Sequence, residues 1–199
     1  MKELIKLIPA GTFAICLNEI KKRKPKLFSY EDAANLPWAE YQETLTNYIV
    51  KYVNCFKKFK AISPEPSIPE TGLKGVYFCI GGDGCSLAVG GSLYFDEEDW
   101  AANADFYPES EDASNLLLHI AESITPKLRH WEINYSIVYE IMYIFSAFTI
   151  FHAMKKLENI QEIFNCGIAM GFSSGGELTL GHFVNGKFKE KITIVEDVF

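Results

Sequence analysis

The sequence predicts an α+β fold in which a mainly antiparallel sheet of about five strands packs against several helices. Apolar residues recur at helical spacing in the first third of the chain, and short β-rich runs bounded by glycine pairs begin after residue 72. The longest apolar run, at 131–156, has the length of one helix. Helices and strands come in blocks, which favours α+β over a doubly wound parallel sheet.

One domain is expected to include all of residues 1–199. A chain of 199 residues with 48% hydrophobic residues can bury a substantial core of its own. We divide this domain into a helical part at 1–60, a proline-rich connector at 61–72, and a region of strands and helices at 73–199.

The N-terminal part is predicted to hold two main helices. The first, over 12–23, follows a Pro-x-Gly break and ends in the basic cluster at 21–26, which is typical of a helix C-terminus. The second, over 38–60, carries one apolar stripe at helical spacing, formed by Leu45, Tyr48, Ile49, Tyr52, Val53, Phe56 and Phe59.

Two or three antiparallel strands are predicted after the connector, in the runs LKGVYFCIGG and CSLAVGGSLYF. The glycine-rich turn at 81–84 between them lacks the lysine and Ser/Thr of a phosphate-binding loop, so a hairpin turn explains it better. A short helix is expected at 114–124, before Pro126.

The run at 131–156 is long enough to span a bilayer, but Glu140 lies near its middle. A carboxylate there costs roughly 2.5 kcal/mol or more at the centre of a membrane. We therefore favour a central helix covered by the sheet and by other helices, with Glu140 in a water-facing position.

A three-stranded meander is predicted to end the chain. Its strands are 166–172, 177–184 and 187–194, with turns at 173–176 and at Asn185-Gly186, the latter a strong signal for a two-residue hairpin.

The net charge of −7 is unevenly distributed: residues 1–60 carry +5, residues 61–130 carry −9 and residues 131–199 carry −3. An acidic middle third repels nucleic acid and anionic lipid and favours a basic partner. The five cysteines are widely spaced without a C-x-x-C pair, which argues against a disulfide framework and a zinc site and favours a reducing cytoplasm.

The stretch Ser92–Asp112, SLYFDEEDWAANADFYPESED, has the most unusual composition in the chain. It contains eight carboxylates and no basic residue, with aromatic side chains among the acids. Aromatic anchors with a charged rim are typical of protein interfaces. We expect binding of a protein partner through Trp100, Phe106, Tyr107, Asp96, Glu97, Glu98, Asp99 and Asp105.

Other kinds of site have weaker support in the sequence. The acids lack the D-x-[DN]-x-[DN]-G spacing of a calcium loop, residues 173–176 lack the G-x-S-x-G elbow, and a cysteine nucleophile would need a nearby histidine such as His119 or His182. No metal or cofactor is therefore expected.

The runs GGSLYFDEEDWAANADFYPE and GIAMGFSSGGELTLG, at about 90–108 and 167–181, resemble segments of small bacterial cytoplasmic proteins of the polymorphic-toxin immunity type. This resemblance implies a single-domain α+β protein that binds and neutralises another protein, such as a basic toxin domain, without catalysis.

Two other functions stay open at this point. The chain could be a small enzyme with carboxylates such as Glu140 or Asp99 in a cleft between the sheet and helix 131–156. Alternatively, it could have a structural or oligomeric role, with the acidic stretch serving solubility alone.

Overall fold

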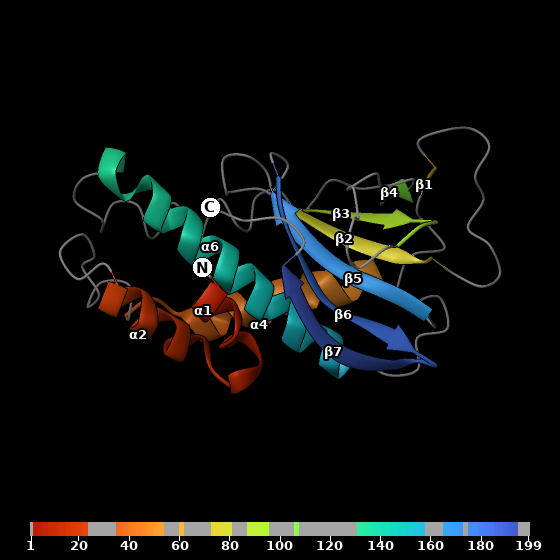
Figure 1. Cartoon of the computed structure of the whole chain (residues 1–199), viewed down its shortest axis with the longest axis horizontal. Coiled ribbons are helices and arrows are strands. Elements are labelled where there is room, and N and C mark those ends of the chain that lie inside the picture. The colour runs from red at the N-terminus through yellow and green to blue at the C-terminus, as the bar shows by residue number, and fades with distance from the viewer. Residues whose placement is uncertain are drawn as a thin grey trace.

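The computed structural model describes residues 2–23, 35–53, 60–61, 73–80, 87–95, 106–107, 131–157, 165–172 and 175–194. These residues form helices on one side of a single, mostly antiparallel sheet (Figure 1). The predicted α+β class is confirmed.

The sheet has seven strands in the order β1-β4-β3-β2-β5-β6-β7. Five have six or more residues: β2 (Gly75–Ile80), β3 (Leu87–Ser92), β5 (Asn165–Phe172), β6 (Gly175–Val184) and β7 (Lys187–Ile194). The other two, β1 (Lys60–Ala61) and β4 (Phe106–Tyr107), have two residues each.

One parallel pair joins the two antiparallel parts of the sheet. Strand β2 pairs antiparallel with β3 and parallel with β5, and β5 to β7 form an antiparallel meander. The parallel pair arises because the chain passes through helix α6 (Trp131–Lys156) between β4 and β5. The order of the strands was not predictable from the periodicity of the sequence.

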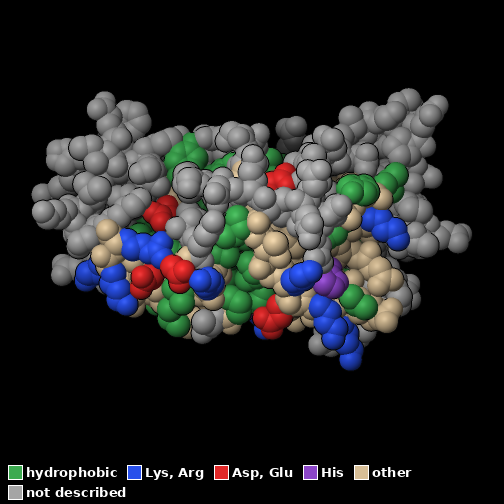
Figure 2. Space-filling model, in the orientation of Figure 1, with side chains coloured by type: hydrophobic (Ala, Val, Ile, Leu, Met, Phe, Trp, Pro, Cys, Tyr) green, Lys and Arg blue, Asp and Glu red, His purple; other side chains and the backbone are tan. Residues whose placement is uncertain are grey.

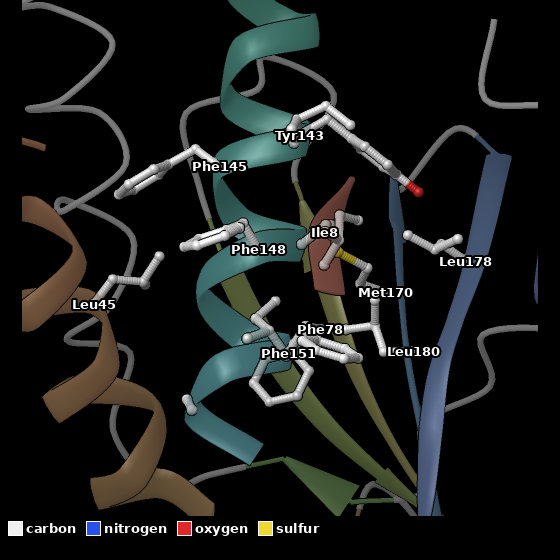
Figure 3. Packing of buried hydrophobic residues seen from close by; sticks show 14 of the residues in the cluster. Ile8, Leu45, Phe78, Tyr143, Phe145, Phe148, Phe151, Met170, Leu178 and Leu180 are labelled. Atoms are coloured by element: carbon white, nitrogen blue, oxygen red, sulfur yellow. The ribbon is translucent and has the colours of Figure 1, made fainter. Parts of the chain in front are cut away.

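Helix α6 is the centre of the hydrophobic core. From Glu140 to Met154 every side chain except that of His152 is buried. Figure 3 shows Phe148 and Phe151 of this helix between Leu45 on one side and Phe78 of the sheet on the other. An all-round apolar helix is expected where a helix is covered on most sides. No helix within the described ranges is both long and apolar enough to cross a membrane.

The N-terminal helical elements pack around α6 and against one another. They are α1 (Lys2–Ile5), the 3-10 turn η1 (Ile8–Ala10), α2 (Phe13–Arg23) and α4 (Trp38–Val53). The aromatic rings of Phe13 and Trp38 lie 4.6 Å apart, and both contact Phe145 of α6 at 5.1 Å. These contacts connect α2 and α4 to the centre of the core.

Three predictions about the fold are wrong. The helix predicted over 38–60 does not reach its expected end, since Lys60 and Ala61 form strand β1 and pair with β4. Ala61 therefore belongs to the sheet, although we placed it in the connector. Glu140 was expected to face water, yet its side chain is only 7% exposed. The helix predicted at 114–124 and the turn at 81–84 lie outside the described residues.

Candidate functional site

A groove of about 390 Å³ lies at one end of the sheet, where β2 and β5 begin and β3 and β6 end. It is open to solvent and is lined by Lys74, Leu93, Tyr94, Phe95, Asn165, Cys166, Gly167, His182, Phe183 and Val184. Its volume falls within the range of about 300–1,000 Å³ that is common for ligand sites.

The apolar wall of the groove is exposed to an unusual degree. Only four large hydrophobic side chains are exposed among the described residues, and three of them line this groove: Tyr94 at 60%, Leu93 at 38% and Val184 at 36%. The fourth, Ile15, lies on α2. Because single exposed hydrophobic residues are ordinary, it is the convergence of three on one groove that indicates a binding surface.

The groove lies on the outer face of the sheet, defined here as the face away from α6. Alternation along β2 places Val76 and Phe78 in the main core, whereas Tyr77 packs with Ala169 in a second, smaller cluster. Phe95, which follows β3, is packed against this smaller cluster. The outer face therefore has its own apolar layer next to the groove.

Two glycines give Phe95 its place on the outer face. Gly75 and Gly167 are paired in register, and a Cβ atom on Gly167 would collide with the Phe95 ring. The Phe95 ring therefore occupies the space that the Cβ atom of any other residue at position 167 would take. This close approach explains why the position at 167 requires glycine.

Backbone hydrogen bonds fix the strand ends around the groove. The Lys74 N–H donates to the Ser92 carbonyl at 2.9 Å, and the Gly167 N–H donates to the Lys74 carbonyl at 2.8 Å. The Tyr94 N–H donates to the Ser92 hydroxyl oxygen at 3.1 Å. The residues that lead into the acidic stretch are thus held against β2 before Asp96 begins.

The polar groups of the groove are cationic or neutral. Lys74 is exposed, His182 is half-buried, and Asn165 accepts a hydrogen bond from the Asn185 N–H at 3.3 Å. Lys187 and Lys189 are exposed on β7, opposite Val184 and His182. Figure 2 shows histidine in purple beside lysine side chains in blue on this part of the surface. No carboxylate from the described residues lines the groove.

Cys166 and His182 do not form a nucleophile and base. They lie on opposite faces of the sheet, since Cys166 belongs to the main core and His182 pairs with Gly167 on the outer face. Burial raises the pKa of the Cys166 thiol far above its ordinary value, although nearby Lys74 lowers it slightly. A thiol in this environment stays protonated.

In the described part of the chain, no three His, Cys, Asp or Glu side chains come together to hold a metal ion.

The structure describes only two of the predicted partner-binding residues. Phe106 and Tyr107 form β4, which pairs with β1 and, at Gly91, with β3. Trp100, Asp96, Glu97, Glu98, Asp99 and Asp105 lie outside the described residues. The pairing of β4 with β3 places the Phe106 backbone opposite Gly91, about one strand spacing away, near 5 Å. This strand was not predicted, because two residues carry no periodic signal.

Glu140, one of the two carboxylates named in the enzyme hypothesis, lies away from the groove. Glu140 is on α6, on the opposite side of the sheet from the outer face, and Asp99 lies outside the described residues.

Sequence reasoning missed Lys74, Leu93, Asn165 and His182 as neighbours in one site, since they come from four separate segments. The exposed Tyr94 was noted only as part of the acidic stretch.

Comparison of the chain with family models, curated proteins and solved structures gives no match. The candidate function therefore rests on the groove and its surroundings.

Proposed function

We propose that this chain is a non-catalytic protein-binding module whose contact surface combines the groove with the acidic residues that come after Phe95 in the sequence. The observation that carries the proposal is the convergence of Leu93, Tyr94 and Val184 on one open groove. Tyrosine is among the side chains that most often dominate the affinity of a protein interface, and the contacts around such an anchor exclude water from it.

A run of acidic residues follows the groove residues directly in the sequence, beginning with Asp96 after Phe95. We take these acids to form the rim of the contact surface. Charges at the rim of an interface mainly speed association and select the partner. A protein partner with a basic surface fits this arrangement, and a basic toxin domain would be one such partner.

The first test is affinity capture from an extract of the source organism, with the Tyr94→Ala protein as a parallel bait. We expect a basic protein that the original chain retains and the Tyr94→Ala bait loses. Removing an aromatic anchor from the centre of an interface typically costs at least 2 kcal/mol, or about thirtyfold in Kd. Ile15→Ala is the matched control, because Ile15 is also an exposed hydrophobic residue but lies on α2.

Kinetics with the purified partner separate the two parts of the surface. Neutralising Glu97 and Glu98 should lower the association rate and flatten its salt dependence, whereas Trp100→Ala and Tyr94→Ala should raise the dissociation rate. A captured partner whose binding is unchanged by all of these substitutions would show that another surface is used.

A further inference from the structure

The charged side chains of the groove are opposite in sign to those that follow Phe95 in the sequence. Lys74 and His182 line it, Lys187 and Lys189 stand on the neighbouring strand, and the described lining residues include no acid. An apolar site with cations at its edge is complementary to an apolar group that carries a negative charge.

We propose that the groove binds the C-terminal residue of the protein partner, with its side chain against Tyr94 and Phe95 and its terminal carboxylate beside Lys74. This inference rests on the proposed function, since it takes the groove to be part of the partner-binding surface. It adds to the proposed function the chemical group that the groove would bind, a C-terminal carboxylate.

A chain terminus reconciles the two opposite charges of this region. A basic protein has a carboxylate at its own C-terminus whatever its net charge, so Lys74 and the acidic stretch can contact the same partner. A generally acidic peptide would be repelled by the net charge of −9 that residues 61–130 carry.

The open shape of the groove favours a peptide end over a small free acid. Sites for small molecules bury most of the ligand surface, whereas this groove is open to solvent. A peptide can place one residue in such a groove while the rest of its chain continues over the rim. The exposed Tyr94 and Val184 provide apolar surface at that rim.

The test uses fluorescein-labelled peptides and the complete chain, so no partner has to be known. The probes are Gly-Ala-Gly-Ala-Phe with a free C-terminal carboxylate, the same peptide as the C-terminal amide, and Gly-Ala-Gly-Ala-Ala as the free acid. We expect the first to bind at least tenfold more tightly than the amide, because a charge-assisted hydrogen bond is lost in the amide. It should also bind more tightly than the alanine peptide.

Variants of exposed lysines test the position of the carboxylate. Lys74→Gln should remove most of the preference for the acid over the amide, and Lys74→Arg should retain it. Lys156→Gln is the matched control, since Lys156 is an exposed lysine at the end of α6. Circular dichroism confirms that each variant keeps its fold.

Two results would overturn the inference: no binding of the acid peptide at millimolar concentration, or equal binding of acid and amide. Preferential binding of free N-acetylphenylalanine over the peptide would also overturn it, in favour of a small-acid site. If peptides fail while a captured partner still depends on Tyr94, the proposed function stands without this inference. If acid-selective peptide binding occurs but no partner depends on Tyr94, the groove selects a C-terminal carboxylate, whereas the proposed function fails and with it the assignment of that carboxylate to a protein partner.

Discussion

The ring of Phe95 lies directly against the backbone of Gly167, in space that a Cβ atom would otherwise occupy. Gly167→Ala should therefore push the ring away from the sheet and destabilise the protein. Overpacking of this kind typically costs about 1–3 kcal/mol. Urea denaturation of the variant and the original chain measures the change in the free energy of unfolding.

A double-mutant cycle shows whether Phe95 is the cause. In a Phe95→Ala background the added methyl group meets no ring, so Gly167→Ala should cost far less there than in the original chain. Equal costs in both backgrounds would show that the glycine is required for another reason.

Phe148 is predicted to be among the most costly side chains to truncate. It is 2% exposed on α6, and its ring lies 6.1 Å from that of Phe13 and 4.3 Å from that of His152. Phe148→Ala should lower the free energy of unfolding by about 3–5 kcal/mol, because the surrounding layers cannot close the cavity fully. Chemical denaturation provides the measurement.

The exposed residue Ile15 supplies the comparison for this core substitution. Ile15→Ala should change stability by about 0.5 kcal/mol or less, since 40% of the residue is already in contact with solvent. A loss below 1 kcal/mol for Phe148→Ala would contradict a tightly packed position between the helices and the sheet.

Periodicity predicted the regular elements well because burial on one face leaves a clear pattern. The stripe of the second long helix places Leu45 and Ile49 in the core, and the alternation at 187–194 places Phe188 towards α6. The Asn185-Gly186 turn has the two positive φ angles, 51° and 74°, that a two-residue hairpin requires. Each of these signals is local in the chain.

The groove was not predictable because its residues are brought together by the order of the strands. Lys74 and Asn165 are neighbours only because β2 pairs in parallel with β5, a pairing that no local pattern encodes. The same limit applies to Glu140. Its sequence position showed a charge in an apolar helix, but its burial depends on what the fold places around it. The make-up of the groove and the burial of Glu140 both depend on contacts between segments that are far apart in the sequence.

Site-resolved alkylation should distinguish the described cysteines. Burial raises the pKa of the Cys16 thiol to about 11 and that of Cys166 further still, while the half-buried Cys79 has a smaller rise from the same cause. Since the thiolate is the reactive form, Cys16 and Cys166 should react with iodoacetamide at pH 8 far more slowly in the native protein than in urea. Peptide mass spectrometry quantifies each site separately.

The order of reactivity is the informative result. Cys79 should react faster than the other two described cysteines in the native protein, and all three rates should converge in urea. Native alkylation of Cys166 at the rate seen in urea would mean that its strand opens readily and that the main core is not closed around it.

His152 should make the stability of the protein depend on pH. Its Nε2 lies 3.1 Å from the Ile8 carbonyl oxygen, to which the Nε2–H tautomer donates a hydrogen bond. Burial is the main cause that lowers the pKa of His152 below its ordinary value of 6.5; Lys155 and Lys156 lower it further, while the Ile8 carbonyl and Glu190 oppose the change. The folded protein therefore takes up a proton here less readily than the unfolded chain.

The direction of the effect follows from this difference in proton uptake. Between the lowered pKa and 6.5 the unfolded chain holds more protons, so the contribution of His152 to stability is fully present above about pH 6.5 and is lost as the pH falls below it. Urea denaturation from pH 8 to pH 5 should show this loss, and it should be smaller in His152→Gln, whose amide can still donate to Ile8 but does not titrate. A stability difference between the two proteins that stays constant over this range would show that His152 titrates alike in the folded and unfolded states.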